Sequence, residues 1–485
     1  MTDQTTTPEE LEALLARAAE AAPGWAAHSP ADRADTLTAV ADALDERADE
    51  LLPLAKEESR LPDGRLAGEL KRTTFQLRLF AELLRDGAYL DARVDHADAD
   101  WPMGARPDIR RVLVPLGPVL NFAAGNFPFA FSVAGGDSAA ALAAGCPVLV
   151  KVHPGHPRLS ARTGAVVAEA LRAAGAPDGV LGLIHGVDQG VTALRDPRVK
   201  AASFTGSIPG GRALFDIACS RPEPIPFYGE LGSVNPTFVT RAADAARAEE
   251  ITEGFVGSFT LGAGQFCTKP GVLAVPEGSA VLERLRSTTL PGPAPMLTSR
   301  FAESYARRLG ELSGHDAVGP LTVGEDAYAD SPAPALLTAS IEDVLANGDE
   351  LLAECFGPAA LVVTYAEESQ LVALAGALDG QLTATIVGED DDAVAPELVR
   401  LLADRAGRVL WNQWPTGVSV TYAQQHGGPY PATTAPTTTS VGTAAISRFL
   451  RPVAYQGFPE HLLPDALKEA NPESLPRLVD GKPAV

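Results

Sequence analysis

The sequence has few cysteines, few positive charges and no long apolar run. Its 485 residues include only 4 scattered cysteines, which argues against a disulfide framework and favours a reducing, cytoplasmic location. Lys and Arg number 39 against 62 Asp and Glu, so the formal net charge is −23. Such a charge repels nucleic-acid phosphates and anionic membranes, and neither is expected as a partner. No apolar run is long enough to span a bilayer, and the polar start from Met1 to Glu10 is unlike a secretory signal.

The length predicts two or three domains, since one hydrophobic core rarely serves so long a chain. The N-terminal region is expected to be helical. Ser29-Pro30 is typical of a helix N-cap followed by the first helical position, and apolar residues then recur at helical spacing from Leu37 to Leu44. A further amphipathic stretch covers residues 65–84.

From Arg110 onward, predicted strands and helices alternate. The expected strands are 112–114, 119–120, 147–152, 180–184 and 201–205, and the expected helices are 133–144, 160–173 and 213–218. This alternation predicts right-handed crossovers and a parallel sheet. Ligands of such sheets bind past the carboxyl ends of the strands, where Asn126, Lys151 and Gly206-Ser207 are expected to lie.

Two residues are candidates for chemistry on a carbonyl group. Cys267 lies in the glycine-rich run Gly262–Gly271, with Gln265 and Lys269 as polar neighbours. A thiolate is a strong nucleophile, more so when its pKa is lowered, although most free cysteines are small buried hydrophobic residues. Glu230 ends an apolar stretch, so it is either a buried general base with a raised pKa or a salt-bridged structural carboxylate.

Other polar residues point less specifically to a ligand. The turn Thr205–Arg212 carries Gly206-Ser207 into a helix N-terminus, which attracts anions, although an ordinary β–α turn has the same pattern. Lys151 either caps the sheet or meets the hydroxyls and phosphate of a ligand. His153 and His156 share one loop, but no Cys or carboxylate completes a ligand set there, so no metal is expected.

Six motifs, in order along nearly the whole chain, resemble those of the aldehyde dehydrogenase superfamily. They are Pro115–Val119 with Gly125–Pro128, Gly145–Lys151, Phe204–Ser207, Glu230–Gly232 with Asn235-Pro236, Gly264–Cys267, and Glu354–Pro358. The resemblance implies an α/β fold with a Rossmann-type cofactor domain over residues 1–229 and an α/β catalytic domain over 230–430. A C-terminal return over 431–485 would form a small β oligomerisation element with the segment near 107–120. The resemblance also implies a homodimer or homotetramer.

The resemblance implies a role for each motif. Cys267 would attack the aldehyde carbon, and the tetrahedral thiohemiacetal would pass hydride to the nicotinamide. Asn126 and the Cys267 backbone N–H would bind the oxyanion, and Glu230 would activate the water that hydrolyses the thioester. The residues implied to bind the cofactor are Lys151, His153, Gly206, Ser207, Glu354 and Phe356.

Further runs resemble one branch of that superfamily. The branch holds α-ketoglutaric semialdehyde (2,5-dioxopentanoate) dehydrogenases and related NADP-linked fatty-aldehyde dehydrogenases. The runs are 151–157, 267–271, 426–433, 439–445 and 448–453. Pro154 stands where the superfamily usually has a Glu that binds an adenosine-ribose hydroxyl, so NADP is the expected cofactor, with NAD as an alternative. The run 426–433 replaces the usual Gly-Gly-x-Lys-x-Ser-Gly element.

The expected reaction is oxidation of 2,5-dioxopentanoate to 2-oxoglutarate, with a broad-specificity or fatty-aldehyde dehydrogenase as the alternative. Two alternatives come from other classes. One is a non-catalytic structural or binding homologue, against which Cys267, Glu230 and Asn126 argue. The other is an enzyme that transfers the acyl group to coenzyme A, against which Glu230 argues, because a hydrolytic base is unwanted there.

Two expectations concern regions outside the motifs. A substrate carboxylate needs local hydrogen-bond donors in so acidic a protein, and the sequence does not reveal them. Trp411, Trp414 and Tyr422 lie near the part of the sequence where the family lines its aldehyde channel, although they could equally be core or wall aromatics. The tail 472–485 has little apolar content and is expected to be loose.

Overall fold

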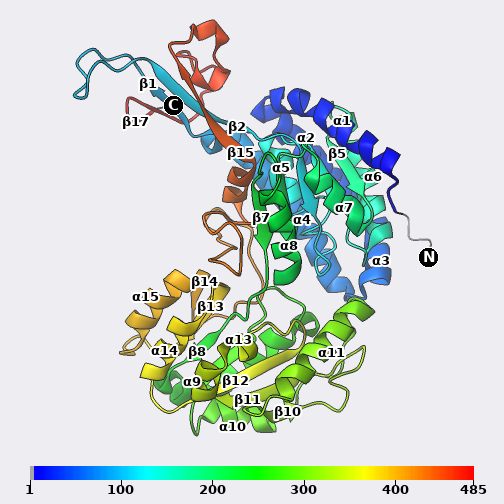
Figure 1. Cartoon of the computed structure of the whole chain (residues 1–485), viewed down its shortest axis with the longest axis vertical. Coiled ribbons are helices and arrows are strands. Elements are labelled where there is room, and N and C mark those ends of the chain that lie inside the picture. Colours follow the sequence, from blue (N-terminus) through cyan, green and yellow to red (C-terminus); the bar gives the residue numbers. More distant parts are fainter. Residues whose placement is uncertain (1–4, 485) are drawn as a thin grey trace.

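The computed structural model describes residues 5–484, whose strands form three sheets (Figure 1). Residues 1–4, at the start of the predicted cofactor domain, and residue 485, at the end of the predicted tail, lie outside the described residues. Figure 1 shows one sheet protruding at the top, a second in the middle and a third below. Over residues 5–484 no helix is both long and apolar enough to cross a bilayer.

Four helices precede the first strand. They are α1 (Pro8–Ala27), α2 (Pro30–Glu46), α3 (Ala48–Ser59) and α4 (Asp63–Asp86). The predicted start of α2 is confirmed, because the Ser29 hydroxyl accepts a hydrogen bond from the Asp32 N–H at 3.1 Å. The predicted amphipathic stretch 65–84 is the body of α4, which packs against α2. The buried face of α4 joins a core that also contains the fully buried Trp25.

The middle sheet is parallel, as the alternation of strands and helices predicts. Its strand order is β5-β4-β3-β6-β7. The strands are β3 (Val119–Phe122), β4 (Val148–Lys151), β5 (Leu181–Ile184), β6 (Ala201–Thr205) and β7 (Phe227–Glu230). The connecting helices are α5 (Asp137–Ala144), α6 (Pro157–Ala173), α7 (Val187–Arg195) and α8 (Ile208–Cys219). The chain order reverses at β3, between β4 and β6, which is where such sheets bind ligands.

The three helices expected in this region have other bounds than predicted, and the helix expected over 160–173 begins three residues earlier, at Pro157. The helix expected from residue 133 begins only at Asp137, because Gly136 has φ +55° and a Cβ at Gly135 would lie 2.4 Å from the Ala130 oxygen. The helix expected over 213–218 extends back to Ile208, where Ser207 is its N-cap. The glycines that suggested a longer turn are therefore inside α8.

The lower sheet has seven strands in the order β10-β11-β12-β9-β8-β13-β14. All neighbouring pairs are parallel except β10 with β11. The strands are β8 (Thr237–Val239), β9 (Val272–Pro276), β10 (Gly319–Val323), β11 (Ala335–Ser340), β12 (Ala359–Tyr365), β13 (Gln381–Val387) and β14 (Ala406–Trp411). The helices are α9 (Arg241–Thr260), α10 (Ala280–Ser287), α11 (Ser299–Ser313), α12 (Ile341–Ala346), α13 (Gly348–Leu351), α14 (Ser369–Ala377) and α15 (Ala395–Arg405).

The protruding sheet joins the two parts of the chain that were predicted to form one element. Its order is β15-β2-β1-β16-β17, and β2 (Ile109–Pro115) pairs antiparallel with β15 (Leu450–Gln456). The expectation of a loose tail is wrong. β16 (Arg477–Val479) pairs with β1 (Ala92–Asp95), and β17 (Lys482–Ala484) pairs with β16, so backbone hydrogen bonds hold a segment of low apolar content.

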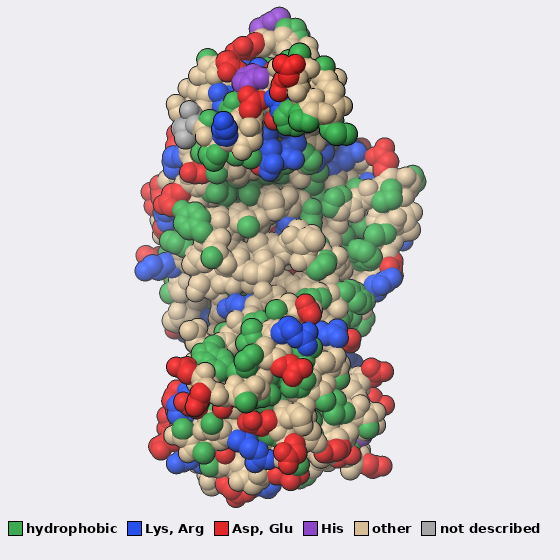
Figure 2. Space-filling model, turned by 90° about the vertical axis from the view of Figure 1, so that its left-hand side faces the viewer, with side chains coloured by type: hydrophobic (Ala, Val, Ile, Leu, Met, Phe, Trp, Pro, Cys, Tyr) green, Lys and Arg blue, Asp and Glu red, His purple; other side chains and the backbone are tan. Residues whose placement is uncertain are grey.

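Short 3-10 helices complete the backbone. They are η1 (Ala88–Leu90), η2 (Leu261–Gly264), η3 (Thr443–Phe449), η4 (Glu460–Leu462) and η5 (Asp465–Leu467). η2 leads directly into the predicted nucleophile loop. On the face shown in Figure 2, acidic side chains are interspersed with basic ones.

Candidate active site

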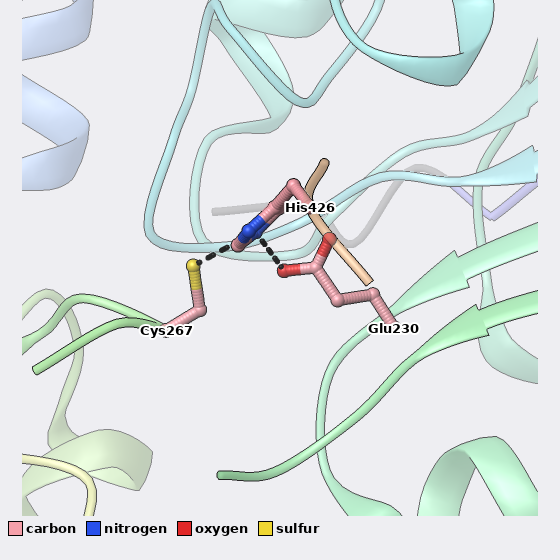
Figure 3. Close-up of side chains that lie close together, drawn as sticks. All are labelled: Glu230, Cys267 and His426. Atoms are coloured by element: carbon pink, nitrogen blue, oxygen red, sulfur yellow. Dashed lines mark hydrogen bonds and ion pairs between the residues drawn. The ribbon is translucent and has the colours of Figure 1, made fainter. Parts of the chain in front are cut away.

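The structure brings Cys267 and Glu230 together and adds a third residue, His426 (Figure 3). Glu230 is the last residue of β7, Cys267 follows η2, and His426 lies in the long loop after β14. The Cys267 Sγ lies 3.5 Å from the His426 Nε2, which lies 2.9 Å from the Glu230 Oε1. One ligand atom from each of the three residues lies within 4.8 Å of the others. Such atom types at this spacing can also bind a metal ion, and the expected absence of a metal stays a prediction.

His426 reaches the site because the C-terminal run returns alongside β7. The Leu231 N–H donates to the Ala432 oxygen at 2.8 Å, and the backbone of Glu230 forms an isolated antiparallel β-bridge with that of Thr433. The Ser440 hydroxyl donates to the Glu230 Oε2 at 2.7 Å. Both oxygens of the carboxylate are therefore hydrogen-bonded.

Sequence reasoning did not assign a role to His426. The run 426–433 indicated a resemblance to one branch and a departure from the general superfamily pattern, but no role for the histidine. The signal was the position of that departure, because a segment that replaces a family element near the active site brings its own side chains there.

Glu230 is buried, as predicted, but its pKa is shifted in the unexpected direction. Burial by itself raises the pKa, since only 2% of the side chain is exposed. The charge and hydrogen bond of His426 and the hydrogen bond from Ser440, with Arg448 nearby, outweigh that effect and lower the pKa to about 2. The expectation of a raised pKa is wrong, because the sequence could not show these partners. Glu230 is therefore ionised at neutral pH.

The pKa of the Cys267 thiol is raised, so the resting nucleophile is protonated. Burial is the largest cause, and the negative charge of Glu230 beside the thiol is the next. A nucleophile without a lowered pKa needs a base to accept its proton during attack. Glu230 and His426 lie where such a base is required.

The nucleophile loop is held by contacts that leave little freedom. Gly264 has φ +64°, and a Cβ there would lie 2.2 Å from the Gly357 oxygen, so only glycine fits. The buried Asn235 amide donates to the Cys267 oxygen at 2.8 Å and to the Lys269 oxygen at 3.0 Å. Asn235 therefore fixes the backbone on both sides of residue 268.

The two expected polar neighbours of the thiol are bonded elsewhere. The Lys269 ammonium donates to the Cys355 oxygen at 2.9 Å and to the Ala359 oxygen at 2.7 Å. The Gln265 side chain accepts from the Leu297 N–H at 2.9 Å. These side chains tie the nucleophile loop to neighbouring segments.

Asn126 lies beside the nucleophile loop. Its side-chain Nδ2 donates to the Gln265 oxygen at 3.1 Å, two residues before Cys267. An amide nitrogen carries two hydrogens, so one N–H stays available for an oxyanion. The Arg65 guanidinium donates to the Asn126 oxygen at 2.7 Å and so supports this position.

The residues predicted to bind a cofactor lie at the carboxyl edge of the middle sheet and on the facing loop. Lys151 ends β4, and Gly206-Ser207 precedes α8. Burial lowers the pKa of Lys151. Burial also lowers the pKa of His153, to about 3, with a smaller contribution from the charges of His156 and Lys151. His153 is therefore uncharged at neutral pH. The His153 ring packs toward Phe301 of α11, with ring centres 6.2 Å apart.

Phe301 also connects this edge to the loop before β12. Its ring centre lies 5.7 Å from that of Phe356. Glu354, in the same loop, has its pKa raised to about 7, because burial outweighs the opposing charge of Lys269. His153 and Phe356 thus both lie close to the Phe301 ring.

A cavity of about 250 Å³ ends at Cys267 and His426. Three phenylalanines form part of its wall: Phe127, Phe131 and Phe266. None of Trp411, Trp414 and Tyr422 borders this cavity, which favours the alternative that they are core or wall aromatics.

The three expected aromatics have other surroundings. Trp414 packs on Phe255, with ring centres 5.9 Å apart. Trp411 is 36% exposed and Tyr422 is 62% exposed, and the Tyr422 hydroxyl donates to Glu82 at 3.4 Å. The wall aromatics come instead from the loop after β3 and from the residue before the nucleophile.

A Rossmann-like parallel sheet, a second α/β unit and a cysteine facing a buried carboxylate define an oxidoreductase that works through a covalent intermediate. The aldehyde dehydrogenase family model matches residues 2–293, and the chain belongs to that family. The chain is therefore an oxidoreductase acting on aldehydes. The family uses a nicotinamide cofactor, NAD or NADP.

Two relatives cover nearly the whole chain. It is 44% identical over 482 residues to an α-ketoglutaric semialdehyde dehydrogenase 2 of Azospirillum brasilense, covering 98% of this chain and 91% of that one. It is 42% identical over 455 residues to an α-ketoglutaric semialdehyde dehydrogenase of Acinetobacter baylyi, covering 93% and 86%.

A solved structure confirms the predicted fold. An NAD-dependent aldehyde dehydrogenase of Sinorhizobium meliloti superposes with a TM-score of 0.75 at 23% identity, covering 93% of this chain and 88% of that one. The predicted α/β aldehyde dehydrogenase fold is therefore correct.

Proposed function

We propose that this protein oxidises 2,5-dioxopentanoate to 2-oxoglutarate with NADP in preference to NAD. The observation that carries the proposal is the 44% identity, over 98% of the chain, to an α-ketoglutaric semialdehyde dehydrogenase. The cluster of Cys267, His426 and Glu230 supports it, because aldehyde oxidation needs a nucleophile and a base in contact. The apolar wall formed by Phe127 and Phe131 favours a fatty-aldehyde dehydrogenase as the second candidate.

The chemistry follows from the positions of the side chains. The Cys267 sulfur attacks the aldehyde carbon as its proton passes to the ionised Glu230, beside which His426 lies. The free N–H of Asn126 and the backbone N–H of Cys267 stabilise the oxyanion of the thiohemiacetal. The bound nicotinamide supplies the acceptor for the hydride that leaves this carbon. After it has released the thiol proton to solvent, Glu230 takes a proton from the water that attacks the thioester and passes it to the departing sulfur, so that the carboxylate product and the free thiol are released.

The residues at the carboxyl edge of the middle sheet fit a nicotinamide dinucleotide. Lys151 offers an ammonium to ribose hydroxyls and phosphate, and the start of α8 at Ser207 offers backbone N–H groups to a phosphate. Gly206 lets the backbone come close, Glu354 would bind the ribose hydroxyls of the nicotinamide half, and Phe356 would pack beside the ring.

The NADP preference rests on the loop after β4. Pro154 is exposed there and has no carboxylate to repel a 2′-phosphate, while Lys151 keeps a cation nearby. His153 is uncharged, so it would serve as a hydrogen-bond donor and not as a second cation. Preference for NADP by about 1–3 kcal/mol is expected, the scale of one charge-assisted hydrogen bond.

The deciding experiment compares kcat/KM for three aldehydes with NADP and with NAD. We expect 2,5-dioxopentanoate to exceed both pentanal and a long-chain aldehyde, and NADP to exceed NAD. A higher value for the long-chain aldehyde supports the second candidate. Addition of coenzyme A with analysis for an acyl-CoA product tests the acyl-transfer alternative, and absence of any NADPH formation would support a non-catalytic homologue.

The arrangement of the chain also carries a proposal about assembly. Residues 1–229 would bind the cofactor, residues 230–430 would carry the catalytic loop, and the protruding sheet formed with residues 431–485 would join subunits. Its outer strands β15 and β17 each pair on one side only within residues 5–484. We expect a cytoplasmic homodimer or homotetramer, and light scattering coupled to gel filtration measures the mass that decides between them.

A further inference from the structure

Two arginines of α4 line the cavity that ends at the nucleophile. Arg65 and Arg72 are seven residues apart, close to two helical turns, so they lie on the same face of the helix. Cys267 and His426 border the same cavity, which places the two arginines near the reacting atoms. Neither forms an ion pair within 4 Å in the part of the chain that the structure describes.

Nitrogen atoms of both guanidinium groups lack partners. The Nε and Nη1 of Arg65 and the Nη1 of Arg72 are buried without a hydrogen bond to residues 5–484. Of the Arg65 side-chain nitrogens only Nη2 donates a hydrogen bond within residues 5–484, to the backbone oxygen of Asn126. An unpaired buried N–H costs free energy, so a ligand that brings acceptor oxygens to these atoms gains affinity.

Aromatic rings hold the guanidinium groups in place. The Arg65 guanidinium lies 4.4 Å from the ring centre of Phe266 and 5.1 Å from that of Phe127, and the Arg72 guanidinium lies 5.1 Å from that of Phe131. These rings also form the cavity wall. The cavity therefore combines an apolar wall for methylene groups with cations for an acid group.

One carboxylate shares this region without neutralising it. The Glu69 Oε1 accepts from the Phe129 N–H at 2.8 Å and the Ala130 N–H at 3.0 Å, and its Oε2 is buried without a partner. Burial raises the pKa of Glu69. The lining of this cavity thus contains two arginines and one glutamate, in a protein whose net charge is −23.

We propose that Arg72, supported by Arg65, binds the carboxylate of the substrate, so that the enzyme selects short aldehydes that carry an acid group at the far end. The proposal rests on the oxidation of 2,5-dioxopentanoate put forward above. A guanidinium matches a planar carboxylate with two parallel hydrogen bonds. The Arg72 side chain forms no hydrogen bond within residues 5–484, whereas the Arg65 side chain donates to the Asn126 backbone oxygen, so the Arg72 guanidinium is the freer of the two.

The test compares an acid aldehyde with its uncharged counterpart in matched variants. Arg72→Met removes the charge, Arg72→Lys keeps it without the fork, and Lys71→Met removes a cation from an exposed position next in sequence that does not border the cavity. For Arg72→Met we expect kcat/KM for 2,5-dioxopentanoate to fall about a hundredfold, mainly through KM, because a buried charge partner is lost. The value for pentanal should stay within about threefold, Arg72→Lys should recover part of the loss, and Lys71→Met should match the wild type.

Each outcome decides the proposal. Equal losses with both aldehydes would show that Arg72 only supports the fold, and unchanged KM for 2,5-dioxopentanoate in Arg72→Met would show that it does not touch the acid group; either result overturns the inference. The wild-type preference tests the proposed function separately. A wild type that prefers 2,5-dioxopentanoate while Arg72→Met keeps that preference refutes the arginine site alone, whereas a wild type that prefers pentanal refutes both.

Discussion

Removal of the negative charge of Glu230 should make the Cys267 thiol easier to ionise. In the wild type the pKa of this thiol is raised, first by burial and then by the neighbouring carboxylate. Glu230→Gln keeps the shape of the side chain and can still hydrogen-bond to Ser440, but it carries no charge. The thiol should therefore ionise at a lower pH in the variant than in the wild type.

The distance between the groups sets the size of the shift. Reactive atoms of the two residues lie within 4.8 Å of each other. Two unit charges at that distance repel by about 3.5 kcal/mol at an effective dielectric constant of about 20, and by about 1 kcal/mol in bulk water. Since one pKa unit corresponds to about 1.4 kcal/mol, the expected decrease is roughly 0.6 to 2.5 units, toward the upper end because the site is buried.

The rate of alkylation by iodoacetamide as a function of pH measures this shift. Only the thiolate reacts, so the midpoint of the profile reports the thiol pKa. Glu354→Gln is a suitable control, because Glu354 is half-buried and also raises the thiol pKa, but less than Glu230 does. We expect both midpoints to fall, with the larger change in Glu230→Gln. An unchanged or higher midpoint in Glu230→Gln would refute the coupling between the two residues.

Further predictions concern catalysis and stability. Cys267→Ala should abolish aldehyde oxidation and leave cofactor binding, measured by fluorescence titration, nearly unchanged; substantial activity would exclude the covalent route. Glu230→Gln should retain a pre-steady-state burst of NADPH, because the thiol ionises more easily without the neighbouring carboxylate and then needs no base for its attack, but it should turn over slowly, because hydrolysis loses its base. In the wild type kcat/KM should rise from pH 7 to pH 9, since the raised thiol pKa leaves most of the thiol protonated at neutral pH; a flat profile would contradict this. Asn235→Ala should lower the free energy of unfolding by about 2–4 kcal/mol in denaturant titrations, because two backbone oxygens of the nucleophile loop lose their donor. Treatment with EDTA should leave activity unchanged, which an enzyme assay before and after dialysis checks.

Local sequence patterns predicted much of the fold. The Ser29 N-cap could be predicted from the sequence because its hydrogen bond reaches only three residues along the chain. The parallel middle sheet followed from the alternation of strands and helices, which leaves few topologies. Helix limits were less certain at Gly136, because a positive φ depends on how the preceding loop meets the helix.

Motifs identified Cys267 and Glu230 before the structure placed them together. Each residue lies in a short motif at a local turn or at the end of a strand. A resemblance in the motif therefore also identifies the residue. The same holds for Lys151, which ends β4, and for Ser207, which is the N-cap of the helix that follows β6.

Only the tertiary structure decided what surrounds these residues. His426 meets Glu230 across 196 positions of sequence, and this contact, with that of Ser440, turned an expected rise in the Glu230 pKa into a fall. The arginines of α4 reach the site from a helix whose pattern indicated only packing. Burial and charge at a point in space are sums over residues from distant segments, and the order of residues along the chain does not contain those distances until the chain has folded.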